Sequence, residues 1–329
     1  QRKTRVAARE ALPAAILEAA GEVEEPAAKS LFSAMQRASV VLPGFADAPV
    51  ETSYVSVGKS RSKQPLVLCL HGFDSSFLEF RRLLPLLSAQ GVEAVAVDVL
   101  GWGFTALQGV NDFSAGKSIA RAHLMAFWEQ VLERRPVVLL GASLGGAIAV
   151  DFALASPPGA VAGLVLVDGQ CYIDGAGPGG ALPAGLSRLG IRVLGSRPLR
   201  RLANRLAYFD KELATEDAMR VGRLHTLQDG WEDASMGYMR SGGFSVSKRM
   251  AEVTAPSLVL WGRQDEILDP KTARPERFVE EMPRAELRYV ENCGHVPHLE
   301  QPQETALLIA AFTATAAAAT KPAAPAAAR

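Results

Sequence analysis

Uninterrupted apolar segments alternate along this chain with longer stretches of mixed polarity. Segments without a polar break are typical of strands that are buried on both faces of a parallel sheet. Such segments cover 65–70, 136–140, 164–168 and 255–262, and 286–290 is a shorter predicted strand. The pattern therefore predicts several strands of a parallel sheet, spaced widely enough for other elements to connect them.

One predicted strand leads directly into a helix-forming stretch through the sequence PVVLLGASLGG, which covers Pro136 to Gly146. Ser143 lies at this junction between small residues, where a sharp turn forces a strained backbone conformation. The turn also lifts the serine Oγ clear of the sheet edge, as in a nucleophile elbow. A glycine-rich turn with a helix-capping serine has the same short pattern, so the neighbouring segments must decide between the two interpretations.

A second candidate segment, His71-Gly72-Phe73, follows the predicted strand 65–70. Ester hydrolysis places negative charge on the former carbonyl oxygen, and two fixed backbone N–H groups can stabilise that charge. We interpret the amides of Phe73 and Leu144 as these two donors. Because Gly72 also suits a tight turn after a strand, spacing alone does not separate this interpretation from a purely structural one.

The remaining candidate groups follow later strands. Asp265 comes after the strand 255–262, and His295 lies in the loop after 286–290. The chain order Ser143, Asp265, His295 differs from that of the two best-known serine protease folds. Each group follows the C-terminal end of a strand, and in open α/β sheets that edge is where sites form.

Five ordered motifs, HGF, DVLGWGF, GASLGG, WGRQD and GHVPHLEQP, make residues 50–315 resemble the α/β-hydrolase superfamily, apart from a middle insertion. The resemblance implies an α/β-hydrolase fold: a central, mostly parallel sheet with helices on both faces and an inserted helical lid. It also implies that Ser143 is the nucleophile, His295 the general base and acid, and Asp265 the orienting carboxylate. Phe73 and Leu144 become the oxyanion-hole donors. A serine nucleophile favours an acyl substrate that passes through an acyl-enzyme.

Alternatives remain open at several positions. Asp168 also ends a strand and could replace Asp265 as the acid, and Asp269 is a third candidate. His298 lies close to His295, and we interpret it as a lid-facing or pocket residue because the resemblance places the base directly after a glycine. Three further polar residues are interpreted as structural or surface groups: Asp98, His123 and His225.

Composition narrows the class of protein. The 35 basic and 35 acidic residues cancel, so a nucleic-acid partner is not expected. The chain has no apolar run of about 18 residues, so we expect no transmembrane segment, although peripheral membrane contact through the insertion stays open. Cys69, Cys171 and Cys293 are too dispersed for a disulfide framework or a zinc site. We expect free thiols and neither a metal nor a cofactor.

The predicted organisation has five parts. Residues 1–50 form an N-terminal helical extension, whose basic start resembles the remnant of an organelle transit peptide. Residues 51–170 and 251–315 form the two parts of the hydrolase core, with a lid insertion at 171–250 between them. Residues 316–329 are predicted to be a disordered Ala/Pro-rich tail.

The predicted lid carries apolar side chains that suit a long hydrocarbon or a large aromatic ligand, although packing of the lid on the core is the commoner role. These residues are Phe209, Trp231, Met236, Tyr238, Met239 and Phe244. Three arginines of a helical-looking piece, Arg200, Arg201 and Arg205, are interpreted as a solvated helix face.

Segments 73–82 and 96–104 resemble chloroplast α/β-hydrolases of plants and green algae. That group includes esterases that act on the phytyl ester of chlorophyll or pheophytin, an algal chlorophyllase type among them. The resemblance therefore implies a chloroplast enzyme that releases phytol from a chlorophyll-type pigment. Two other functions remain open: a general carboxylesterase or lipase, and a small-molecule receptor that keeps the triad.

Overall fold

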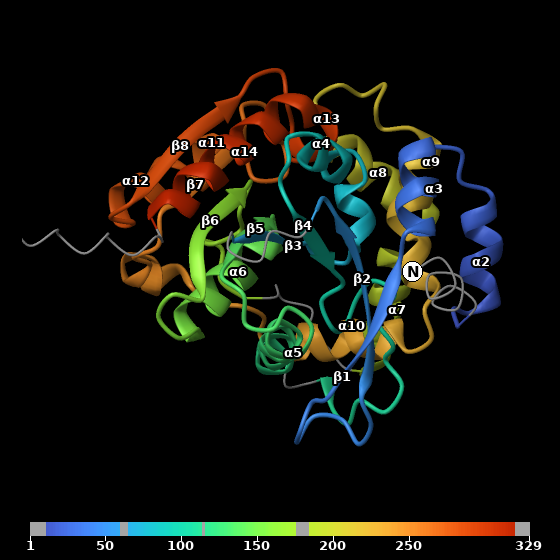
Figure 1. Ribbon diagram of the computed structural model, residues 1–329. Helices are drawn as coiled ribbons and strands as arrows, with labels where there is room; N and C mark the ends of the chain where they lie inside the picture. Colours follow the sequence, from blue (N-terminus) through green and yellow to red (C-terminus); the bar gives the residue numbers. More distant parts are fainter. Residues whose placement is uncertain (1–10, 60–64, 114–115, 176–183, 320–329) are drawn as a thin grey trace, which may run out of the picture.

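The computed structural model describes residues 11–59, 65–113, 116–175 and 184–319, and its centre is one sheet of eight strands (Figure 1). The strand order is β1-β2-β4-β3-β5-β6-β7-β8, with β1–β2 and β2–β4 antiparallel and the other pairs parallel. The strands are β1 Gln36–Val40, β2 Val50–Val57, β3 Leu66–Leu70, β4 Ala94–Val97, β5 Val137–Ala142, β6 Val161–Val167, β7 Ser257–Gly262 and β8 Ala285–Val290. The predicted central, mostly parallel sheet is confirmed.

Helices cover both faces of this sheet, as the apolar runs require. In β3 every residue is buried; Leu68 belongs to one hydrophobic cluster, and Val67 and Cys69 belong to the other. Helices α5 (Lys117–Gln130) and α6 (Leu144–Ala155) contribute to the first cluster, and α4 (Leu83–Ala89) and α14 (Pro302–Ala319) to the second. Successive side chains of a strand point to opposite faces, so a strand between two helical layers must be apolar throughout.

The last helix corrects one prediction. Residues 316–319 belong to α14 and not to a disordered tail, and Ala316 is buried against the core. Alanine has the highest helix propensity, and α14 also packs on α4, so the alanine-rich sequence continues as helix. Residues 320–329 lie outside the described ranges.

The N-terminal region also contributes a strand to the central sheet, which the sequence did not predict. Besides helices α2 (Ala14–Gly21) and α3 (Pro26–Ser33), residues 1–50 contain β1, which pairs with β2 in the sheet. This edge strand lacks a continuous apolar run, which is why the sequence pattern did not reveal it. The predicted transit remnant lies outside the described residues.

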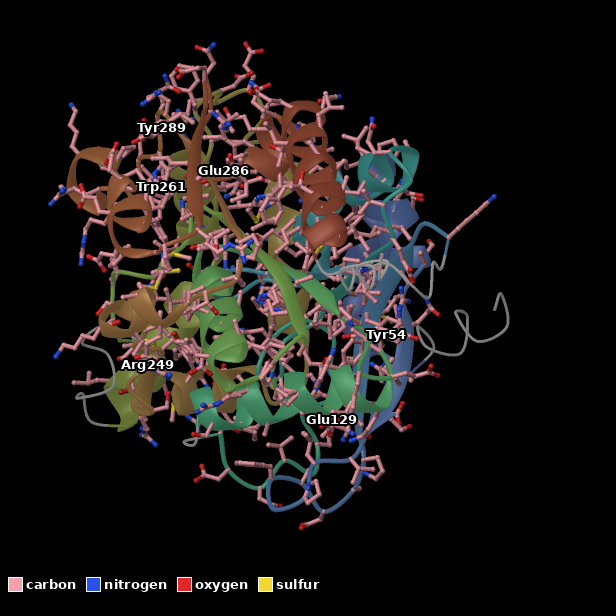
Figure 2. All side chains as sticks on the ribbon, turned by 60° about the vertical axis from the view of Figure 1, so that its left-hand side comes forward. Tyr54, Glu129, Arg249, Trp261, Glu286 and Tyr289 are labelled. Atoms are coloured by element: carbon pink, nitrogen blue, oxygen red, sulfur yellow. The ribbon has the colours of Figure 1, made fainter. Side chains whose placement is uncertain are left out.

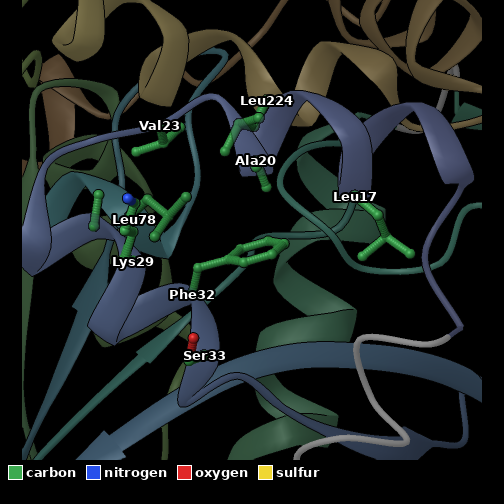
Figure 3. Close-up of a pocket in the computed structure, with 10 residues that line it drawn as sticks. Leu17, Ala20, Val23, Lys29, Phe32, Ser33, Leu78 and Leu224 are labelled. Carbon is green, nitrogen blue, oxygen red and sulfur yellow. The ribbon is translucent and has the colours of Figure 1, made fainter.

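The structure also places helices α2 and α3 against the middle insertion. The backbone N–H groups of Glu24 and Glu25 donate to the Asp217 carboxylate at 2.8 and 2.6 Å. An apolar pocket of about 490 Å³ lies between the two helices, with Phe32 and Leu78 in its wall (Figure 3). None of its lining residues is a candidate catalytic group.

The insertion between β6 and β7 is helical in its described part. It contains α7 (Ala184–Leu194), α8 (Arg197–Ala207), α9 (Glu216–Arg223), α10 (Trp231–Arg240) and the 3-10 helices η4 (Leu224–Leu227) and η5 (Ser247–Glu252). Residues 176–183, near the start of the predicted lid insertion, lie outside the described ranges. Within the described ranges, no helix combines the length and the apolar character needed to cross a bilayer.

After the insertion the chain returns to the sheet edge. Trp261 of β7 pairs with Tyr289 of β8 in register, and the two side chains lie near each other in Figure 2. Trp261 is buried against Phe278 of α12 (Glu276–Glu281), while the Arg263 guanidinium lies 3.5 Å from the centre of the Tyr289 ring. This register brings the loops that follow β7 and β8 to the same edge of the sheet.

Candidate active site

Ser143 lies in a sharp turn between β5 and α6, with backbone angles φ 51° and ψ −118°. A positive φ is rare for a residue with a side chain and stores strain that the surrounding structure must hold. The residues that flank this turn must be glycines, because a side chain at either position would clash with the backbone. An added Cβ at Gly141 would lie 2.2 Å from the Gly145 carbonyl oxygen, and one at Gly145 would lie 2.1 Å from the Leu70 oxygen. The strained turn predicted from GASLG is thus present.

His295 and Asp265 form a hydrogen-bonded pair, with 2.7 Å between Nδ1 of His295 and Oδ2 of Asp265. The second carboxylate oxygen accepts from the N–H groups of Ile267 and Leu268 at 2.7 and 2.8 Å. Burial of Asp265 favours its neutral form, but the hydrogen bond and charge of His295 outweigh burial and lower the pKa of Asp265 below its ordinary value. The pair therefore consists of an ionised carboxylate that fixes the imidazole ring.

The pair and Ser143 lie at the same edge of the sheet, because β5, β6 and β7 are neighbours. The Ser143 N–H donates to the carbonyl oxygen of Val167, the last residue of β6. The loops after β7 and β8 also touch: an added Cβ at Gly262 would lie 1.8 Å from the Gly294 oxygen. Sequence reasoning placed all three groups after strand ends, and the structure brings those ends together.

The alternative acids behave differently from Asp265. Asp269 is exposed and accepts a hydrogen bond from the Lys271 N–H at the start of α11 (Pro270–Ala273), which makes it a helix cap. Asp168 is fully buried, and its Oδ1 accepts from the Gly262 N–H at 2.9 Å. Burial and the nearby Asp265 charge raise the pKa of Asp168 well above its ordinary value. The surroundings of Asp168 thus disfavour its ionised form, whereas those of Asp265 favour it.

A metal site needs several ligand atoms close together. Among the described residues, one group meets this condition, with ligand atoms within 4.8 Å of one another: Asp168, Asp265 and His295. Two ligands of one tetrahedral zinc ion lie about 3.3 Å apart, given metal–ligand distances of about 2.0 Å. The 2.7 Å between His295 and Asp265 instead fits a direct hydrogen bond. The donor set therefore fits a proton-transfer pair better than a metal centre.

The peptide group that joins Gly72 and Phe73 is held from its oxygen side. His71 accepts at Nε2 from the Val99 N–H at 3.1 Å, so Nδ1 carries the proton and donates to the Gly72 oxygen at 2.8 Å. Burial lowers the pKa of His71 to about 4, which keeps this ring neutral. In a trans peptide the N–H points away from the C=O, so His71 orients the Phe73 N–H.

The second predicted donor, the Leu144 N–H, is at the first position of α6, where backbone N–H groups have no acceptor within the helix. The two loops are in contact, since an added Cβ at Gly72 would lie 3.3 Å from the Ser143 Cβ. Both predicted donors therefore lie beside the serine turn. The partial positive charge of a helix N-terminus adds to the stabilisation that such a pair gives an oxyanion.

His298 differs from its prediction as a lid-facing or pocket residue. It lies in α13 (Pro297–Glu300), is 1% exposed and packs on the Phe80 ring. Its Nε2 lies 3.2 Å from the Glu79 carboxylate, whose other oxygen accepts from the Gly72 N–H at 2.9 Å. His298 is therefore a core residue beneath the Gly72 loop. Its partner is 219 positions away in sequence, beyond the reach of any local pattern.

Glu79→Gln should show the contribution of this buried pair to stability. Burial raises the pKa of Glu79, but the His298 hydrogen bond and charge outweigh it and lower that pKa from 4.5 to about 2. The stabilisation is therefore present above pH 4.5, amounts to about 3 kcal/mol there, and is lost as pH falls toward 2. Urea unfolding should show a large difference between wild type and variant at pH 7 that shrinks at pH 3. A difference that does not vary with pH would contradict the lowered pKa of the Glu79 carboxyl.

Three residues interpreted as structural or surface groups occupy buried networks. Asp98 accepts from Ser53 Oγ and from two backbone N–H groups, which braces the turns after β3 and β4. His123 lies 2.8 Å from Thr52 Oγ1 and accepts from the Leu100 N–H. The third, His225, contacts Asp74 and is discussed below.

The insertion residues divide between core packing and the rim of the site. Trp231, Met236, Tyr238 and Phe244 are buried in the hydrophobic core, and the partly buried Met239 packs against it. Three exposed apolar side chains belong to segments that form the site, and we call them the rim. Phe73 is a predicted oxyanion donor, the Ile267 N–H donates to Asp265, and the Phe209 backbone nitrogen would lie 2.7 Å from an added Cβ at Gly294. Other exposed apolar side chains lie on α7 and α8.

The arginines of α8 are only partly a solvated face. Arg201 fits that prediction, since it forms an exposed ion pair with Glu216. Arg200 does not: its side chain is 16% exposed and forms an ion pair with the buried Asp74 carboxylate. The sequence pattern did not reveal Asp74, His71 and Glu79 as supports of the site, because each has at least one partner far away in the chain. The signal that could have pointed to them was their position within ten residues of the predicted donor Phe73.

Comparison with known proteins agrees with this architecture. Residues 67–306 match a model of the alpha/beta hydrolase family. The chain is 36% identical over 293 residues to the alpha/beta hydrolase domain-containing protein VTE7 of Arabidopsis thaliana, covering 88% of this chain and 87% of the relative. It is 30% identical to a 2-hydroxy-6-oxononadienedioate/2-hydroxy-6-oxononatrienedioate hydrolase of Cupriavidus pinatubonensis, over 70% of this chain and 80% of that one.

Among solved structures, a serine hydrolase involved in carbazole degradation, the CarC enzyme, superimposes with a TM-score of 0.68 at 21% identity. The alignment covers 86% of this chain and all of that structure. At this level of identity the likeness concerns the fold, and it confirms the predicted sheet with helices on both faces. The plant relative agrees with the resemblance seen in the sequence motifs.

Proposed function

Because this chain belongs to the alpha/beta hydrolase family, we propose that it is a serine carboxylic-ester hydrolase that works through an acyl-enzyme. The observation that carries the proposal is the strained turn of Ser143 at the same sheet edge as the His295–Asp265 pair. Such strain is retained where function needs it, and a fixed imidazole beside a serine is the arrangement that activates a hydroxyl.

In the proposed mechanism His295 Nε2 accepts the Ser143 proton while Oγ attacks the ester carbonyl carbon. The N–H groups of Phe73 and Leu144 stabilise the negative charge that forms on the carbonyl oxygen. The C–O bond to the alcohol then breaks, and His295 gives its proton to the leaving oxygen. Water, deprotonated by the same imidazole, attacks the acyl-enzyme and releases the acid. Asp265 stabilises the imidazolium throughout.

For the substrate we propose an ester with a large apolar group, and specifically the phytyl ester of a chlorophyll-type pigment, cleaved to a chlorophyllide and phytol in the chloroplast. The exposed apolar side chains at the rim support an apolar substrate over a dicarboxylate of the kind in the bacterial relative's name. The resemblance of segments 73–82 and 96–104 to chloroplast hydrolases of plants and green algae supports the pigment, and the 36% identity to a plant protein supports an α/β-hydrolase of plant type.

Incubation with a pigment extract, followed by chromatography for free phytol and chlorophyllide, tests this substrate directly. We expect both products in amounts well above the enzyme concentration, and neither product with the Ser143→Ala variant. Turnover of short p-nitrophenyl esters without release of phytol would replace the pigment with smaller esters. Release that stalls after about one ligand per site would indicate a receptor and overturn the proposed enzyme.

A further inference from the structure

Asp74 directly follows Phe73, whose N–H is a proposed oxyanion donor, and it has an unusual backbone. Its φ is +50°, in the left-handed region that residues with a side chain rarely adopt, although aspartate and asparagine adopt it more often than most. Its side chain is buried, which is costly for a carboxylate unless charges and hydrogen bonds compensate. A buried charge on a strained residue next to a reacting group requires partners that hold it there.

Within the described ranges, the Asp74 carboxylate has three side-chain partners, and each comes from the insertion. His225 of η4 and Trp231 of α10 each lie 2.8 Å from Oδ1, and Arg200 of α8 forms an ion pair with Oδ2. Arg200 also donates to the Asp74 carbonyl oxygen at 3.1 Å, so it contacts both the side chain and the backbone. Three separate elements of the insertion thus meet on one residue of the Phe73 loop.

The protonation states agree with this arrangement. Burial raises the pKa of Asp74, but the Arg200 charge and the His225 hydrogen bond hold it well below its ordinary value, so the carboxylate is ionised. Burial lowers the pKa of His225, so its ring is neutral and Nε2 carries the proton that it donates. Asp74 therefore accepts from one charged and two neutral donors of the insertion.

We propose that Asp74 is a positioning residue through which the insertion assembles the oxyanion hole. The carboxylate holds residue 74 in its strained conformation, and that conformation fixes the chain at Phe73. When the insertion moves away, residue 74 relaxes to negative φ and the Phe73 N–H leaves its productive position. Catalytic competence is thereby tied to closure of α8, η4 and α10 on the core. The proposal rests on the proposed ester hydrolase function.

Asp74→Asn tests the proposal with a short p-nitrophenyl ester. Asparagine keeps the shape but leaves Arg200 without its counter-ion, so kcat should fall about 10- to 100-fold while KM changes less than about twofold. Affinity for a trifluoromethyl ketone, whose adduct with Ser143 places an oxyanion in the hole, should fall by a similar factor. An unchanged kcat, or a change confined to KM, would overturn the proposal.

Two further variants separate positioning from general damage to the fold. Arg201→Gln removes a charge from the same helix and the same insertion, but its partner Glu216 is exposed, so kcat should remain at the wild-type value. Arg200→Gln should lower kcat in the same direction as Asp74→Asn but by less, and Arg200→Lys should recover part of that loss. If Asp74→Asn does not fold, an unchanged kcat in Arg200→Gln overturns the proposal.

These experiments distinguish failure of the positioning role from failure of the ester hydrolase assignment. If the wild type shows no turnover, or if Ser143→Ala keeps it, the ester hydrolase function itself is wrong. If the wild type turns over through Ser143 and Asp74→Asn matches it in kcat and in ketone affinity, only the positioning role is wrong.

Discussion

Replacing Ser143 with alanine should abolish covalent labelling by a fluorophosphonate and lower ester turnover by roughly 10⁴- to 10⁶-fold. The hydroxyl is the atom that bonds to phosphorus and to the acyl carbon, and no other side chain takes its place in the strained turn. Intact-mass spectrometry should show one adduct on the wild type and none on the variant. Binding of an unreactive ester analogue should persist, because the substitution removes only one hydroxyl group.

Two matched variants make this result specific. Ser88→Ala, in α4, should keep full labelling. Ser143→Gly should be as inactive as the alanine variant but at least as stable as the wild type, because glycine adopts a φ of 51° without strain. Thermal unfolding of the wild type and the three variants would separate loss of chemistry from loss of fold. Stoichiometric labelling of Ser143→Ala would refute the assignment of the nucleophile.

The sequence predicts those parts of the site that depend on residues close together in the chain. Uninterrupted apolar runs revealed the central strands, since a strand between two helical layers has no polar face. The turn at Ser143 was predictable because the glycines on either side leave no room for a side chain. Asp265 and His295 followed from their positions after strands, since parallel strands end at one edge.

The parts that it does not predict depend on partners far apart in the chain. Asp74 and Arg200 are separated by 126 positions, and nothing local distinguishes Arg200 from Arg201 in the same helix. The pairing follows from which face of α8 packs against the Phe73 loop, which is a tertiary property. His298 is similar: a histidine near the proposed base looks functional in sequence, whereas its burial on Phe80 assigns it to the core. Edge strand β1 was missed because only one of its five residues is buried, so its sequence has no apolar run.

Asp265 is the proposed acid of the triad, and Asp265→Asn should lower kcat by about 10⁴-fold. Asparagine in place of the carboxylate presents an amide to His295 Nδ1, which favours the wrong tautomer and removes the charge that stabilises the imidazolium. Nε2 then carries a proton and no longer accepts one from Ser143. The rate should be measured across pH with a short ester, and the loss should persist where the wild type is most active.

Asp168→Asn is the matched control, since it makes the same change at the neighbouring strand end. Burial and the Asp265 charge raise the pKa of Asp168 and so disfavour its ionised form, which means that asparagine removes less charge here than at Asp265, whose pKa is lowered. The amide oxygen still accepts from the Gly262 N–H that now bonds to Oδ1. We therefore expect kcat within a few-fold of wild type. A larger loss from Asp168→Asn than from Asp265→Asn would move the acid to the end of β6, because only a charged partner of the imidazole is sensitive to this substitution.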